Sequence, residues 1–248
     1  FYIGFGVVNI LIVIILFSFS CTVQLFAQTS AVDDFDELYV MIRDSKISKS
    51  DAIVQLNTLT EQIANLYYGK GGVDHPKEEF CFPLRGYNQS SIGGKNGSGY
   101  ITKDYDFFEG NKHGGHPAHD IFVYDKNQDS NDDRTGNPVD VLSMSGGIVV
   151  ALSKEWEPSS DLRGGKFVMI YDPGTDALYY YAHNNKVSID LGDIVEPCEK
   201  IAEVGRSGLN AYKQRSPTHL HISRFLVNSG DIIPDDLYQD LLKSNVTE

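Results

Sequence analysis

The run Leu220-His221-Ile222-Ser223-Arg224-Phe225 alternates apolar and polar side chains, which is the pattern of a half-buried β-strand. Thr218 and His219 come directly before this run. His219 and His221 are two positions apart, so on a strand they share one face at a separation of roughly 6.5 Å. Both histidines can therefore face one cavity, although this spacing does not require both to bind the same ion.

Strand patterns continue through most of the chain from about Phe80 onward, where short apolar runs are broken by Gly, Asn and Asp. The candidate strands are residues 147–152, 166–171, 178–183, 201–204 and 219–227. Turn sequences such as Asp172-Pro173-Gly174-Thr175 separate them. Because no long amphipathic pattern interrupts this region, we expect a mainly β fold, with an antiparallel sheet or barrel-like domain.

Helical spacing replaces this pattern at the N-terminal side, between about Ala31 and Tyr68. Ser50 is the candidate N-cap of a second helix that ends at Gly69, so a helical hairpin is predicted. A short apolar repeat around Leu237 and Leu241 predicts a terminal helix. We therefore divide the chain into a hairpin and linker over residues 28–75, a β domain over 76–230 and a helical tail over 231–248.

Residues 1–27 contain no charged side chain, and residues 7–17 form an apolar run. Together with Leu25-Phe26-Ala27, this run predicts a cleaved secretory signal peptide. The alternatives are a retained membrane anchor and lipidation at Cys21. All three place the remaining chain outside the cytoplasm, so we expect an exported protein of the periplasm, cell envelope or extracellular space.

Composition limits the classes of partner. The 248 residues are 41% hydrophobic, as is usual for a globular protein, and carry a net charge of −13. This acidic excess argues against nucleic acid or an anionic membrane surface as a partner. Outside the cytoplasm Cys81 and Cys198 can pair, if their geometry allows it.

A second histidine motif, His116-Pro117-Ala118-His119-Asp120, lies well upstream of the first. His116 and Asp120 are four positions apart and share a face of either a strand or a helix. Two histidines and an aspartate are the ligand types that Zn²⁺ prefers, and three protein ligands plus water form an open, catalytic zinc site. The two motifs together predict such a site.

The segment from Phe80 to Leu226 resembles the LytM-type, lysostaphin-like zinc metalloendopeptidases. The matching elements, in order, are Phe82-Pro83-Leu84, Gly115-His116-x-x-x-Asp120, Val139 to Val149, Tyr181-Ala182-His183, Gly192-Asp193-Ile194-Val195, Val204-Gly205-Arg206-Ser207-Gly208 and Thr218-His219-Leu220-His221. The resemblance implies a compact, largely antiparallel β-fold. It also implies one catalytic zinc ion and hydrolysis of peptide bonds in peptidoglycan stem peptides or cross-links.

Carried over by position, the resemblance implies that His116, Asp120 and His221 hold the zinc. His183 and His219 would then be the two unliganded histidines of the active site. We assign His219 as the general base and His183 as the oxyanion donor, two roles that the sequence alone does not separate. The alternatives are a domain that regulates other cell-wall hydrolases, with the hairpin docking a partner protein, and a zinc peptidase acting on a protein substrate.

Three other histidines are interpreted as structural. His119 points away from its neighbours His116 and Asp120 in an extended chain, so we expect it to lie behind the ligands or in solvent. His113 is on a glycine-rich loop and His75 in the linker, where we expect plain loop roles.

The loop that follows His116-Pro117-Ala118-His119-Asp120 suggests a second cation. Residues 125–133 carry side-chain oxygens at alternate positions: Asp125, Asn127, Asp129 and Asn131. This spacing is similar to the first half of an EF-hand loop, which binds Ca²⁺. Ser130 replaces the glycine of that loop, and no bidentate glutamate follows, so an acidic surface loop is the competing interpretation.

Overall fold

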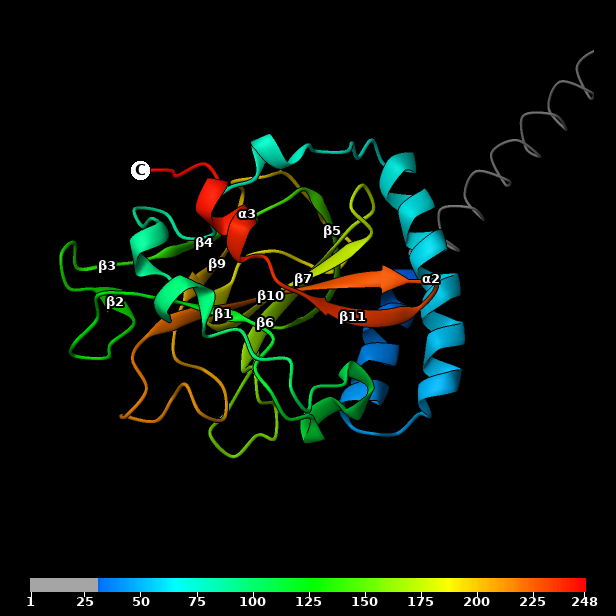
Figure 1. Cartoon of the computed structure of the whole chain (residues 1–248), viewed down its shortest axis with the longest axis horizontal. Helices are drawn as coiled ribbons and strands as arrows, with labels where there is room; N and C mark the ends of the chain where they lie inside the picture. The colour runs from blue at the N-terminus through cyan, green and yellow to red at the C-terminus, as the bar shows by residue number, and fades with distance from the viewer. Residues whose placement is uncertain (1–30) are drawn as a thin grey trace, which may run out of the picture.

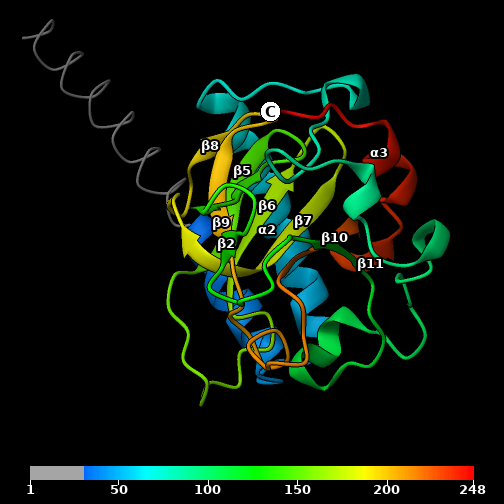
Figure 2. The ribbon, with the colours of Figure 1, turned by 90° about the vertical axis from the view of Figure 1, so that its left-hand side faces the viewer.

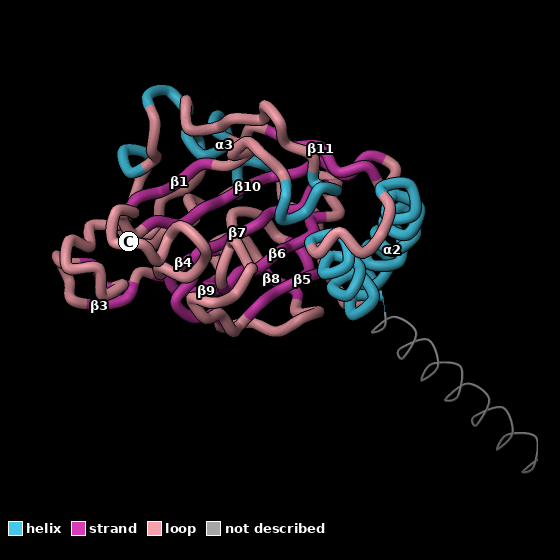
Figure 3. Tube along the Cα trace, turned by 90° about the horizontal axis from the view of Figure 1, so that it is seen from below, coloured by secondary structure: helices cyan, strands magenta, loops and turns pink. Residues whose placement is uncertain are grey.

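The computed structural model describes residues 31–248, and a nine-stranded antiparallel sheet lies at its centre (Figures 1 and 3). Its main path is β1 (His119–Phe122), β10 (His219–Asn228), β7 (Ala177–Val187), β6 (Lys166–Asp172), β5 (Gly147–Ser153) and β8 (Ile194–Val195). The remaining strands are β11 (Asp231–Asp235) beside β10, β9 (Lys200–Val204) beside β7 and β4 (Asp140–Leu142) beside β9. A separate hairpin joins β2 (Asn131–Asp132) to β3 (Asn137–Pro138). The mainly β prediction is confirmed.

Both faces of the sheet are apolar, which explains why its central strands have nearly continuous hydrophobic sequences. On one face, Val149, Val168, Tyr181 and Ile222 belong to a core completed by β4, β9 and the segment around Phe82. The opposite face contributes to a second core, which contains the side chains of Ile148, Phe167, Met169, Phe225 and Val227. This second face is covered by the N-terminal helices.

The predicted helical hairpin is confirmed. Residues 31–43 form the first helix and α2 (Lys49–Gly69) the second, and Figures 1 and 2 show the two packed beside the sheet. The N-cap is Ser48 and not Ser50, because the Ser48 hydroxyl accepts a hydrogen bond from the Asp51 amide at 3.2 Å. Side chains such as Phe35 and Ile63 are fully buried in the second core. The hairpin and the sheet therefore share one core.

The C-terminal segment differs from the helical tail expected over residues 231–248. Its first part is β11, and the only helix is the short α3 (Tyr238–Lys243). Ser229 and Gly230 both have positive φ, so they form a two-residue turn that returns the chain antiparallel to β10. The sequence Asn228-Ser229-Gly230-Asp231 contained this signal for a hairpin.

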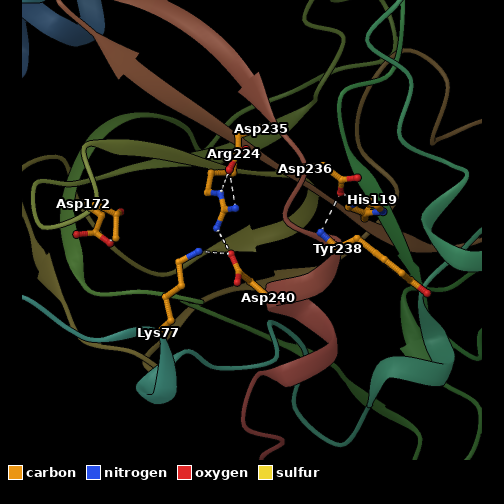
Figure 4. Close-up of polar contacts among 9 residues, drawn as sticks. Lys77, His119, Asp172, Arg224, Asp235, Asp236, Tyr238 and Asp240 are labelled. Carbon is orange, nitrogen blue, oxygen red and sulfur yellow. Dashed lines mark hydrogen bonds and ion pairs between the residues drawn. The ribbon is translucent and has the colours of Figure 1, made fainter.

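A buried arginine holds the C-terminal segment to the sheet (Figure 4). Arg224 donates from Nε to Asp235 at 2.7 Å and from Nη1 to Asp240 at 2.5 Å. Asp240 also accepts a hydrogen bond from the Lys77 ammonium group at 2.8 Å. Because Arg224 is nearly inaccessible to water, its charge and its N–H donors depend on these partners, and Lys77 shares the charge of Asp240.

Cys81 and Cys198 form a disulfide, with their Cα atoms 5.2 Å apart. The bond joins the segment that leads into the β domain to the turn that precedes β9. Cys198 has a φ of +68°, a left-handed conformation that favours glycine. The disulfide therefore fixes a turn whose backbone is intrinsically unfavourable for a side chain.

The predicted signal peptide or anchor over residues 1–27 lies outside the described residues. Within residues 31–248, no helix has the length and apolar character needed to cross a membrane.

We expect Cys81→Ser to lower the free energy of unfolding by roughly 2–5 kcal/mol, because the bond closes a loop of more than one hundred residues. Urea denaturation followed by circular dichroism would measure the loss. Cys198→Ser and wild type under reducing conditions are the matched controls. An unfolding midpoint that stays at the wild-type value in all three samples would contradict the prediction.

Candidate metal centre

The pairing of β1 with β10 brings the two histidine motifs together. Asp120 on β1 lies directly opposite His221 on β10. His116 is held just before β1 by two backbone hydrogen bonds with Ile101. The amide of each residue donates to the carbonyl oxygen of the other. As a result, one potential ligand atom from each of His116, Asp120 and His221 lies within 4.8 Å of the others.

Asp120 is at the centre of this cluster. Its Oδ1 atom lies 3.3 Å from His116 Nε2, 3.2 Å from His221 Nδ1 and 3.7 Å from His219 Nε2. The ring of His183 lies behind these groups, with its centroid 5.0 Å from that of His219 and 5.4 Å from that of His221. All five predicted site residues are thus brought together.

Backbone carbonyls fix the orientation of three of the four imidazoles. Each of these rings donates its Nδ1–H to a main-chain oxygen: His116 to Gly99 at 2.9 Å, His183 to Ser207 at 2.9 Å and His219 to Pro217 at 2.8 Å. Since a carbonyl oxygen only accepts, the neutral rings carry their proton on Nδ1 and present the Nε2 lone pair to the cluster. His221 is reversed, with Nδ1 toward Asp120 and Nε2 3.5 Å from the Ser223 hydroxyl.

His183 occupies a strained position in β7. Its φ is +67°, next to an irregularity in the pairing of β7 with β6 and β9. Its amide donates to the Gly164 carbonyl at 2.8 Å. A Cβ atom at Gly208 would lie 2.7 Å from His183 Nδ1, so a glycine is needed there for the ring to fit. Non-glycine residues with positive φ persist where the surroundings fix them, often at functional sites.

Burial and mutual contacts set the charge states of the cluster. Burial would raise the pKa of Asp120, but its contacts with His116 and His221 outweigh burial and hold that pKa far below its ordinary value. The same Asp120 contact raises the pKa of His116. Burial lowers the pKa of His221, and burial together with the neighbouring His221 and His219 rings lowers the pKa of His183 strongly. A neutral His183 and an ionised Asp120 are therefore the stable forms.

A cavity of about 340 Å³ opens beside the cluster and is bounded by several elements. Besides the five site residues, it is lined by Tyr180 and Ser223 from the sheet and by Arg163 from the loop between β5 and β6. Tyr39 and Arg43 of the first helix also line it. The hairpin therefore contributes directly to the site.

Of the other histidines, His119 lies behind the ligands, one of its two expected places, whereas His113 lines the cavity and not only a loop. His113 lines the cavity and packs against Tyr105, with ring centroids 4.6 Å apart. His119 is fully buried behind β1 and bonds Asp236 through Nε2 at 2.8 Å (Figure 4), so it is not in solvent. His75 lies between the carboxylates of Glu79 and Glu196, each at 2.8 Å.

Within residues 31–248, the one group of three or more His, Cys, Asp or Glu side chains close enough to hold a metal is the cluster around Asp120, and the loop over residues 125–133 contributes none. The Asp125 carboxylate instead accepts hydrogen bonds from the amides of Asp129 and Ser130 and from the Thr218 hydroxyl. Asn127 donates its side-chain amide to Asp129 at 2.9 Å. Because these oxygens stabilise the loop itself, the calcium hypothesis gains no support.

Residues 132–233 match the family model described as Peptidase family M23. We name the matched segment, which is similar to M23 peptidases, the M23 domain. His183, His219 and His221 lie inside the matched region of this M23 domain, whereas His116 and Asp120 precede it and reach the site through the pairing of β1 with β10. The resemblance to LytM-type peptidases is confirmed.

Several solved structures of peptidases are similar to this chain, which spans less than two thirds of the length of the first one named here. One is a putative glycyl-glycine endopeptidase LytM from Ruminococcus gnavus, at 23% identity, 75% coverage of this chain, 64% of the other and a TM-score of 0.44. A second is the catalytic domain of the antimicrobial peptidase lysostaphin from Staphylococcus simulans. It has 19% identity and a TM-score of 0.37, with 52% of this chain and 81% of the other covered. A third is a zinc-containing peptidase from Vibrio cholerae. It has 18% identity and a TM-score of 0.39, with 68% of this chain and 40% of the other covered. No curated protein matches the chain.

Sequence reasoning missed the cavity residues outside the motifs. Tyr180 reaches the cavity because it pairs with Ser223, which shares a face with His221 on β10, and the sequence alone did not give this pairing. Tyr39, Arg43 and Arg163 carried no signal either, because only the packing of the hairpin and the loops brings them to the M23 site.

As the pH is lowered from about 7 to about 5, the free energy of unfolding of the chelator-treated protein should decrease, in part because of His183. Its pKa is lowered in the folded state, so below the ordinary value of 6.5 the unfolded chain takes up a proton that the folded chain does not. We expect urea denaturation to show a shallower loss for His183→Ala than for wild type over this range. Parallel curves for the two proteins would contradict the prediction.

Proposed function

We propose that the protein is an exported, zinc-dependent endopeptidase that hydrolyses peptide bonds of peptidoglycan. The observation that carries the proposal is the convergence of His116, Asp120 and His221, with two further imidazoles beside them. The match to Peptidase family M23 supports hydrolysis of peptide bonds, and the LytM-like motifs support a cell-wall substrate. The disulfide supports a location outside the cytoplasm, where such bonds persist.

The three proposed ligands suit zinc in both chemistry and spacing. Two nitrogens and one carboxylate oxygen form a donor set typical of catalytic zinc sites. Ligand atoms bound tetrahedrally at the usual zinc distances lie about 3.3 Å apart. The separations of Asp120 Oδ1 from His116 Nε2 and His221 Nδ1 are 3.3 and 3.2 Å. The hydrogen bond from His116 to Gly99 also leaves the correct nitrogen free.

When bound, zinc would polarise the scissile carbonyl and lower the pKa of an attacking water. His219 is oriented to accept a proton from that water, because the Pro217 carbonyl holds its Nδ1–H and its Nε2 faces the cluster. Once protonated, the same Nε2 can donate to the leaving amine. His219 is therefore our proposed general base and acid.

The role proposed for His183, donation to the oxyanion, sets a further requirement. In the tautomer selected by Ser207, its Nε2 carries a lone pair and no proton. Burial also disfavours the protonated ring, since it lowers the pKa of His183. Because the one proton that His219 accepts from water goes to the leaving amine, His183 must take up its own proton from solvent before it can donate to the oxyanion.

The proposal is tested by digesting purified, cross-linked peptidoglycan with the protein and identifying released fragments by mass spectrometry. Fragments that vanish after chelation and return with added zinc are the expected result, and their masses identify the bond. Stoichiometric zinc binding without any release would overturn the enzymatic assignment and favour a domain that regulates other hydrolases.

Two variants separate ligand from catalytic roles. We expect His221→Ala to lose stoichiometric zinc after dialysis, as measured by atomic absorption. His183→Ala should retain zinc but lower kcat by about 10²–10³, the cost of removing one oxyanion donor. His75→Ala, which alters a histidine away from the cavity, is the matched control. Loss of zinc from both site variants would refute the assignment of His183.

A further inference from the structure

The cavity beside the histidine cluster is bounded by the N-terminal hairpin. Tyr39, Ile42 and Arg43 of the first helix line it together with His183 and His221. The end of this helix lies against the loop over Phe107–Lys112. The two backbones are so close that a Cβ atom added to Gly110 would lie 2.3 Å from the Arg43 carbonyl oxygen. A chain bound along the sheet therefore meets the helix at this end of the cavity.

Two loops are tied together beside the same cavity. Arg163, from the loop between β5 and β6, donates from Nη1 to the carbonyls of Asn111 at 3.1 Å and His113 at 3.0 Å. All three residues line the cavity. With Tyr180 and Ser223 contributed by the sheet, these loops and the helix leave about 340 Å³, near the lower limit for small-ligand pockets. This space suits the end of a short peptide better than a chain that continues.

Hydrogen-bond donors gather where the helix meets the cavity. Arg43 donates from Nε to Asp44 at 2.7 Å, and its two terminal nitrogens donate to no acceptor within residues 31–248. Tyr39 and Tyr180, which line the cavity with it, keep protonated hydroxyls, since burial raises the pKa of Tyr39 to about 12 and that of Tyr180 well above its usual value. A fixed guanidinium with free donors is the group that best recognises a carboxylate.

We propose that this cavity receives the free carboxylate end of a short peptide, and that Arg43 is the residue that recognises it. The proposal rests on the proposed peptidase function and makes that function more specific. The bond that is cut would lie close to the C-terminal end of the substrate, and the released piece would be short. Arg43 then determines specificity from outside the M23 domain.

The test compares synthetic stem peptides that end in a free carboxylate with the same peptides ending in an amide. We expect wild type to cut the free acids with a kcat/KM about tenfold higher, the size of one charge-assisted hydrogen bond. Arg43→Gln should lose about tenfold on the acids and nothing on the amides. Lys46→Gln, which alters an exposed lysine that does not line the cavity, is the matched control.

A binding measurement makes the result independent of turnover. Calorimetry of the metal-free protein with dialanine and dialanine amide should show tighter binding of the acid by wild type and by Lys46→Gln, but not by Arg43→Gln. Equal binding and equal cleavage of acid and amide by wild type would overturn the proposal. Absence of any peptidoglycan digestion would instead refute the peptidase function, while a preference for the acid in calorimetry would still support the role of Arg43.

Discussion

The site depends on one antiparallel pairing, between β1 and β10. This pairing places Asp120 opposite His221, and strand geometry then directs His219, His221, Ser223, Phe225 and Val227 to one face. The first two of these residues belong to the histidine cluster, whereas Phe225 and Val227 belong to the core under the helices. A shift of one residue in register would turn every one of these side chains to the opposite face. The core thus specifies the register that the site requires.

Much of this arrangement could be predicted because it follows from short-range pattern. The alternation after Leu220 identified β10, and the fixed spacing within each histidine motif identified residues that share a face. The meeting of the two motifs was inferred from ligand chemistry and family resemblance, since periodicity says nothing about which strands pair. The turn at Ser229 and Gly230 was missed because the apolar pair Leu241 and Leu242 suggested a longer helix than the chain forms.

Features that depend on tertiary packing were not accessible in this way. His183 has a left-handed backbone that only the bulged pairing of β7 explains, and Cys198 has one that its disulfide partner secures. The approach of Tyr39 and Arg43 to the cavity depends on how the first helix crosses the sheet. Each of these features is decided by segments far apart in the chain, and local propensity gives no information about such contacts.

The core shared by the hairpin and the sheet has a consequence for work with shortened versions of this protein. A fragment cut to the limits of the family match, residues 132–233, would lose Cys81 and the ligand pair on and before β1. A fragment that begins at residue 76 would keep these groups but expose Ile148, Phe167 and Met169 to water. An apolar face of this kind favours self-association over folding. The smallest fragment able to report on this site therefore begins before the first helix.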